Sequence, residues 1–185
     1  MRIVTQSQSK GRRTGLLSRL RSEAGGAVLL EFALVAGPFI AILLAVLQTA
    51  LIFFSDQLLQ TATQSVAREI LTGNVQQTPM TQADFKALAC SKLPTFMNCT
   101  DLTVDVTKVT SFANADTSNP LATYTAGVPS FPNRWQVGGA GDIIMVRLVY
   151  PWSVVGAPNG LTLASLTNGK FLLVGTTLTR TEPYS

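Results

Sequence analysis

The sequence predicts an α+β protein in which a long N-terminal transmembrane helix packs on a small antiparallel β-sheet head. Two patterns support this prediction. An apolar run of 28 residues, broken by a single charge, occupies positions 27–54, and a later segment, 102–109, alternates apolar and polar residues as a half-buried strand does. Hydrophobic residues make up 46% of the 185-residue chain and charged residues only 13%, a balance that a membrane segment explains.

Residues 1–26 form a basic leader with six Lys or Arg residues and one Glu, a net charge of +5, whereas the rest of the chain carries eight basic and nine acidic residues. Because basic flanks stay in the cytoplasm, we expect a cytoplasmic leader, a single-pass helix at 27–54 in a bacterial inner membrane, and a periplasmic head at 55–185. A secretory signal has an apolar region of only about 7–15 residues. The body lacks the basic excess that phosphates require, which argues against a nucleic-acid partner.

Gly37 and Pro38 interrupt the apolar run. Proline removes a backbone hydrogen bond from a helix, and membrane helices tolerate it with a kink. We expect a helix kink here, either a simple one near the inner membrane face or a functional bend that permits helix packing.

The helix is expected to continue beyond the membrane, over 55–72. Apolar residues recur there at helical spacing, at Leu58, Leu59, Ala62, Val66, Ile70 and Leu71. One helix from Ala27 to about Thr72 follows, with Gly73-Asn74 as its C-cap. An ordinary single-pass anchor with a juxtamembrane helix is the alternative.

A short helix is predicted within 78–92. Thr81 can cap its N-terminus, and Asp84 stands three residues on, as in a capping box. Cys90 closes the segment and Cys99 follows soon after. Two close cysteines in an oxidising compartment predict a disulfide, which would pin the end of this helix to the next strand.

Alternation of apolar and polar residues predicts a half-buried strand at 102–109, and two further apolar segments, at 142–152 and 171–184, are also predicted to be strands. The second is the strongest and is expected to end at Pro151. Two connections rich in turn-forming residues separate the strands, a long one at 111–141, with room for short strands, and another at 153–169.

The composition offers little for catalysis. The chain has no histidine, the commonest general base and metal ligand. The glycine-rich stretch 138–142 lacks the Lys-Ser/Thr of a phosphate loop and is expected to be a turn. Asp101, Asp105 and Asp116 do not form a calcium loop and are interpreted as solvated positions. We therefore expect no enzyme activity and no cofactor.

Glu31 is the single charge inside the apolar run. A carboxylate at this depth either lies at the headgroup boundary or has a function. Gly25-Gly26 end the leader, and Glu31-Phe32 follow after four apolar residues. This G-x-x-x-x-E-F arrangement resembles the processing site of type IV prepilins, especially of the Flp/Tad branch. The resemblance implies that a prepilin peptidase cuts between Gly26 and Ala27.

Two later motifs make the resemblance more specific, GD-x-x-x-V-x-x-x-Y-P at 141–151 and R-x-E-P at 180–183. Together with the opening motif they resemble the TadE-like proteins, minor pseudopilins of the Tad (Flp) tight-adherence pilus system, over most of 24–183 except the middle loops. The resemblance implies a long pilin-like helix on the head. It also implies a role in pilus assembly and adhesion, with a prepilin peptidase, a major Flp-type pilin, other TadE/TadF/TadG-like subunits and the inner-membrane assembly platform as partners. The alternative is an uncleaved, membrane-anchored periplasmic assembly factor.

Cleavage would give the Glu31 carboxylate a physical role. It would create an ammonium at Ala27, which becomes buried when subunits leave the lipid and pack together. An unpaired buried charge is very costly. A carboxylate one helical turn along can neutralise such an amine on its own or a neighbouring subunit.

Overall fold

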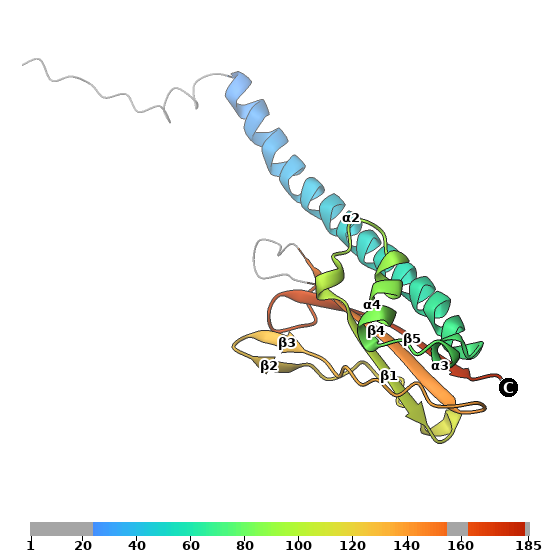
Figure 1. Ribbon diagram of the computed structural model, residues 1–185. Coiled ribbons are helices and arrows are strands. Elements are labelled where there is room, and N and C mark those ends of the chain that lie inside the picture. Colours follow the sequence, from blue (N-terminus) through green and yellow to red (C-terminus); the bar gives the residue numbers. More distant parts are fainter. Residues whose placement is uncertain (1–23, 155–162, 184–185) are drawn as a thin grey trace, which may run out of the picture. The chain divides into compact units, whose positions relative to one another are not determined.

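The computed structural model describes residues 24–154 and 163–183. Most of the basic leader, part of the 153–169 connection and Tyr184 lie outside the described residues. The α+β prediction is confirmed (Figure 1). The elements are α2 (Ala24–Leu71), α3 (Asn74–Gln77), α4 (Gln82–Ser91), β1 (Thr103–Val109), β2 (Thr123–Thr125), β3 (Val128–Ser130), β4 (Ile143–Ser153) and β5 (Lys170–Arg180).

The chain divides into two compact units, Met1–Leu44 and Ala45–Ser185, and α2 contributes residues to both. This helix begins at Ala24, three residues before the predicted start, so Gly25 and Gly26 lie inside it. It ends as expected before Gly73, whose φ of 74° is readily reached only by glycine. Asn74, predicted to share the C-cap, instead opens α3.

Strand β4 lies between β1 and β5 in an antiparallel sheet of order β1-β4-β5. The prediction that Pro151 ends this strand was wrong, since β4 continues to Ser153 and Pro151 pairs with Leu172 of β5. The reason lies in the neighbouring strand β1. Pairing with β1 stops at Val149, so the missing N–H of Pro151 lies on the side where no strand of this sheet follows.

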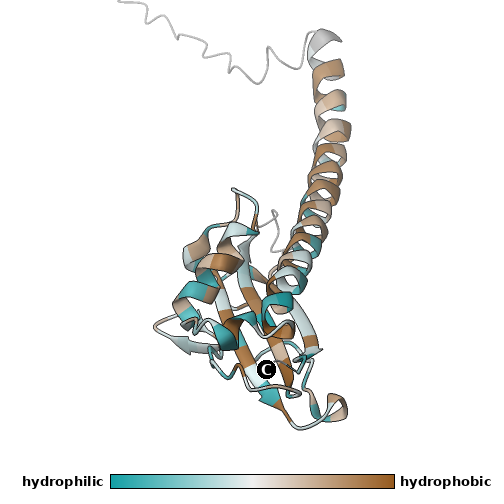
Figure 2. Ribbon diagram, turned by 45° about the vertical axis from the view of Figure 1, so that its right-hand side comes forward, coloured by the Kyte–Doolittle hydropathy of each residue, from teal (hydrophilic) through white to brown (hydrophobic). Residues whose placement is uncertain are grey.

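Helices α2 and α4 pack on one face of this sheet, within the unit Ala45–Ser185. Alternate residues of the strands supply that face, and Figure 2 shows apolar residues along β4 and β5. The fully buried members with the largest side chains include Leu59, Val66, Ile70, Phe85, Val106, Ile144, Leu148 and Leu173. The predicted capping box at the start of α4 is confirmed, with Thr81 and Asp84 bonded in both directions.

The opposite face of the sheet is also covered. Asp105 is only 1% exposed and Arg147 only 4%, and these two charged residues pair across β1 and β4. The prediction that Asp105 is solvated was therefore wrong. The connection 111–141 supplies part of the cover, because Arg134 binds the Asp105 carboxylate and Asp116 accepts a hydrogen bond from Arg147 through its main-chain oxygen.

Both outer strands of the sheet have their free edges occupied. Along β5, the Gln60 side chain of α2 exchanges two 3.0 Å hydrogen bonds with the main chain of Thr176. One turn earlier on α2, the Asp56 carboxylate accepts a hydrogen bond from the main chain of Val174, while partial burial raises the pKa of Asp56 above its usual value.

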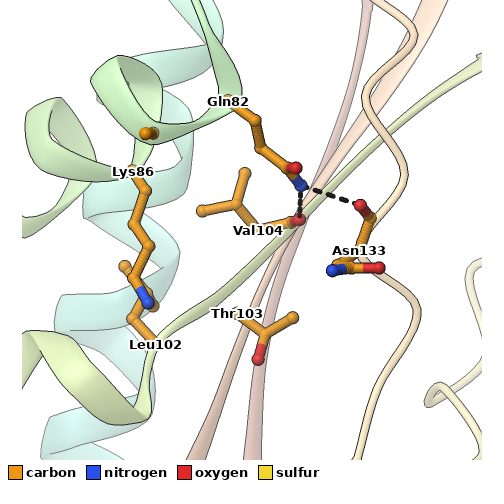
Figure 3. Close-up of a pocket in the computed structure, with 7 residues that line it drawn as sticks. Gln82, Lys86, Leu102, Thr103, Val104 and Asn133 are labelled. Carbon is orange, nitrogen blue, oxygen red and sulfur yellow. Dashed lines mark hydrogen bonds between the residues drawn. The ribbon is translucent and has the colours of Figure 1, made fainter.

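Along β1, the segment 134–136 adds a short parallel bridge centred on Val106. Where this segment diverges from β1, the Gln82 amide of α4 donates to the main-chain oxygens of both Val104 and Asn133, at 3.0 and 2.8 Å (Figure 3). The amide thereby replaces the backbone hydrogen bonds that the diverging strands lack.

Candidate functional site

The N-terminal stretch of α2 is apolar around its whole circumference. Its large side chains from Val28 to Leu44 are all at least 45% exposed. A helix of this kind requires lipid or other helices around it. It is the one helix in the described part of the chain that is long and apolar enough to cross a membrane.

Glu31 is the only charged residue between Ala24 and Ser55. It is exposed, and so is Phe32, at 70%. Because both Ala27 and Glu31 belong to α2 and stand four residues apart, they lie on the same side of the helix. The structure thus places Glu31 one turn beyond the predicted cut, where a carboxylate also complements the positive end of a helix that starts at Ala27.

Gly37 and Pro38 lie inside α2 without ending it. A Cβ added at Gly37 would meet nothing within 4 Å, so this position presents a flat, accessible patch of backbone. The predicted kink stays a prediction. The flat patch is compatible with close approach of a second helix.

The structure brings together the two head motifs that carried the resemblance. The main chains of the pair Gly141-Asp142 and of Thr181 exchange two hydrogen bonds, of 3.0 and 2.9 Å, and Arg180 Nε donates to the Gly141 oxygen at 3.0 Å. One residue on, Glu182 N donates to the oxygen of Leu71 at the end of α2. The two motifs therefore fasten the last strand to the end of the long helix.

Asp142 holds the turn at 138–142 in place. Its carboxylate accepts from Lys108 Nζ and from Gly139 N, both at 2.8 Å, and these bonds, that of Lys108 first, lower the pKa of Asp142. Gly138 has a φ of 63°, and a Cβ there would stand 2.7 Å from Ile144 Cδ1. The predicted turn at this stretch is confirmed, and Gly138 and Asp142 have structural roles in it.

The three aspartates considered for calcium do not converge. Asp105 binds Arg134, while Asp116 accepts from the main chain and hydroxyl of Ser118, which lowers the pKa of Asp116. Within 24–154 and 163–183 no three His, Cys, Asp or Glu side chains gather as a metal site would require.

The predicted disulfide between Cys90 and Cys99 is confirmed, with the two Cα atoms 5.5 Å apart. It joins the last turn of α4 to a 3₁₀ turn before β1. The loop it closes contains Met97, which is 5% exposed and belongs to the core. The bond therefore holds α4, a core residue and the first strand in one local unit.

Replacing Cys90 and Cys99 together with serine should lower the free energy of unfolding of the head by about 2–3 kcal/mol, because the reduced chain regains loop entropy. Urea unfolding of the full chain in mild detergent, followed by tryptophan fluorescence, measures this loss. Dithiothreitol is the control: it should destabilise the parent and leave the double variant unchanged. An unaltered urea midpoint in the double variant would contradict the expectation.

Together these observations define a class of protein: an apolar helix able to span a membrane, continuing into a disulfide-bonded α+β head. Residues 26–68 match the sequence model of a family described as TadE-like protein. The resemblance proposed from the sequence is therefore confirmed over the long helix, including the stretch with Glu31. No curated protein and no solved structure matches the chain. A TadE-like segment relates the chain to the Tad pilus system and to the membrane.

Proposed function

We propose that the protein is a minor pilin or pseudopilin of a Tad (Flp) pilus. It would be inserted with its N-terminus in the cytoplasm and its head in the periplasm, and would take part in pilus assembly and thereby in surface adhesion. The single observation that carries this proposal is the placement of Glu31, the only charged residue between Ala24 and Ser55, on the apolar and exposed stretch of α2 that matches the TadE-like family.

In this proposal a prepilin peptidase cuts between Gly26 and Ala27. The cut site lies in the first turn of α2, where Gly25 and Gly26 both weaken the helix, so this turn can open for a peptidase at small cost. The new ammonium at Ala27 then faces the Glu31 carboxylate of its own or a neighbouring subunit inside a bundle of helices. There the pairing removes the large penalty of a buried, unpaired charge.

The proposed partners follow from this pairing. They are a major Flp-type pilin and other TadE/TadF/TadG-like subunits, which would pack against the exposed apolar stretch of α2, and the inner-membrane assembly platform. The chain itself carries out no catalysis in this proposal. It is a substrate of the peptidase, and separate cytoplasmic motors use the ATP.

A second candidate is a permanently anchored periplasmic assembly factor that keeps its leader. One observation favours it: α2 begins at Ala24 and passes through the cut site as a helix. Mass spectrometry of the protein from the membrane fraction distinguishes the two candidates. An N-terminus at Ala27 supports the pilin, whereas an intact Arg-rich leader supports the anchor.

Replacing Glu31 with glutamine or alanine should lower the yield of filaments by at least about tenfold, because the bundle would then contain an unpaired ammonium. Membrane insertion should survive, since both changes make the helix more apolar. Filaments sheared from cells and the membrane-bound protein are quantified side by side.

Glu69→Gln is the matched control, because Glu69 also lies on α2 and its bond to Asn74 Nδ2 can be kept by an amide oxygen. It should leave filament yield unchanged. If the Glu31 variants assemble as many filaments as the control, the pairing is ruled out.

A further inference from the structure

The apolar run of α2 is longer than a bilayer needs. It covers 28 residues, whereas about 20 cross the hydrocarbon core. The surplus lies in the unit Ala45–Ser185, and there Ile52 is only 5% exposed and belongs to the head core. The head therefore begins to pack on α2 before the apolar run has ended at Phe54.

Contacts along β5 show which end of the head lies beside the last residues of the apolar run. Asp56 binds Val174, Gln60 binds Thr176, and Leu71 binds Glu182, so the helix and the strand run in the same direction. The start of β5 and the end of β4 consequently lie beside the helical turns that precede Asp56. Trp152 and Phe171 form a cross-strand pair at that end, and both pack against the core that includes Ile52.

Several elements carry aromatic side chains at this end of the head. Phe96, from the disulfide-closed loop, is 53% exposed, and its ring meets that of Trp152 edge-on at 6.0 Å. Phe53 and Phe54 of α2 are 67% and 55% exposed. We call this group the aromatic rim: Phe53, Phe54, Phe96, Trp152 and Phe171.

Two lysines accompany the aromatic rim. Lys92 is exposed in the same loop as Phe96, and Lys170 pairs with Ser153 at the end of the sheet. Neither belongs to the two ion pairs found in the described part of the chain. Tryptophan concentrates at the level of lipid headgroups, phenylalanine enters the boundary between headgroups and acyl chains, and lysine ammonium groups are attracted to the lipid phosphates. The rim thus has the composition of a surface that contacts a bilayer.

We propose that the aromatic rim is seated in the headgroup layer of the membrane, so that the head rests on lipid while the chain is anchored. The rim is continuous with the apolar run of α2, which is why lipid is the occupant. The proposal rests on membrane anchoring alone. It holds for a cleaved pilin waiting in the membrane and equally for an uncleaved anchor.

The test uses the full chain in phosphatidylcholine–phosphatidylglycerol vesicles that contain a lipid with a nitroxide on its headgroup. The chain has two tryptophans. Trp135→Phe leaves Trp152 as the only fluorophore, and Trp152→Phe leaves Trp135. Trp135 bridges to Val106, which pairs with Val146, and this point lies six residues before Trp152 along β4, roughly 20 Å away. It is a matched internal control.

We expect the nitroxide lipid to quench Trp152 several-fold more strongly than Trp135, and aqueous iodide to show the opposite preference. Phe96→Ser should reduce the quenching of Trp152 by the lipid and leave Trp135 unaffected. Equal quenching of both tryptophans by the lipid would overturn the proposal. So would shielding of Trp152 from iodide that grows with the protein-to-lipid ratio without lipid quenching, because a second copy would then cover the rim. The vesicles contain no peptidase and no pilin, so the outcome is independent of the proposed function.

Discussion

Replacing Gly175 with valine should destabilise the head by about 3 kcal/mol or more, as expected for a side chain forced into a filled contact. A Cβ at this position would stand 2.1 Å from Thr63 Oγ1 and 3.0 Å from the main-chain oxygen of Leu59. Thr63 cannot easily turn away, because its buried hydroxyl donates to that same oxygen at 2.7 Å. The strand β5 and the helix α2 would have to separate.

Urea unfolding in mild detergent, with the full chain, measures this loss. Gly139→Ala is the control, since a Cβ there meets only Asp142 Oδ2, at an ordinary 3.9 Å. Thr63→Ala should restore part of the stability of the Gly175 variant, because it removes the nearer obstacle and leaves the Leu59 oxygen in place. A Gly175→Val protein as stable as the Gly139 control would show that helix and strand are not packed as described.

Replacing Arg134 with alanine should lower the free energy of unfolding by about 3 kcal/mol, because it leaves a buried carboxylate without its cation. Arg134 Nε and Nη2 bind the two oxygens of Asp105 at 2.9 and 2.7 Å, and these bonds raise the pKa of Arg134. After the change, Asp105 keeps only the main-chain N–H of residue 134. The same unfolding experiment measures the loss.

The matched control is Lys108→Ala, which removes the other ion pair of the described residues. Its partners, Lys108 and Asp142, are 53% and 28% exposed, so the loss should be within about 0–1 kcal/mol. Adding Asp105→Asn to the Arg134 variant should recover stability, since a neutral amide is easier to bury than a carboxylate. Equal losses in the Arg134 and Lys108 variants would refute the assignment of Asp105 as a buried, dependent charge.

Local patterns predicted the elements of this fold well. Alternation located β1, apolar segments bounded by turn-forming residues located β4 and β5, helical spacing located the long helix, and the Thr81–Asp84 pair marked the start of α4. Each of these signals depends on neighbours within a few residues. The continuation of β4 through Pro151 was missed. A proline is tolerated at this point of the strand only because β1 stops pairing at Val149, and the sequence around Pro151 does not reveal where β1 stops.

The burial of Asp105 shows where sequence reasoning ends. Its alternation with Val104 and Val106 correctly separated the two faces of β1, yet it could not reveal that the connection 111–141 covers the polar one. That cover comes from a long segment with weak periodicity, and it is anchored by the Arg134 side chain and by the main-chain oxygen of Asp116. The sequence offered one signal for this buried ion pair: Asp105 is a charge within a strand, and the connection 111–141 contains a single arginine.

One part of the candidate site could be predicted from the sequence and another part could not. Glu31 was identifiable from the sequence because one charge in a long apolar run is costly unless it has a role. The meeting of Gly141-Asp142 with Arg180 and Thr181 was not, because 39 residues separate the Gly141 oxygen from its Arg180 donor. The family resemblance singled out the motifs at 141–151 and 180–183, and the structure shows that their residues are hydrogen-bonded to each other.

The occupied edges of β1 and β5 have a consequence for how such heads tolerate crowding. Unpaired strand edges are templates for aggregation, and proteins held at high density are the most exposed to it. Here Gln60 and Asp56 on one border, and the segment 134–136 on the other, take up main-chain groups that a neighbouring copy would otherwise pair with. Heads confined side by side on one surface can thus stay discrete, and contacts between copies are left to the bare helix.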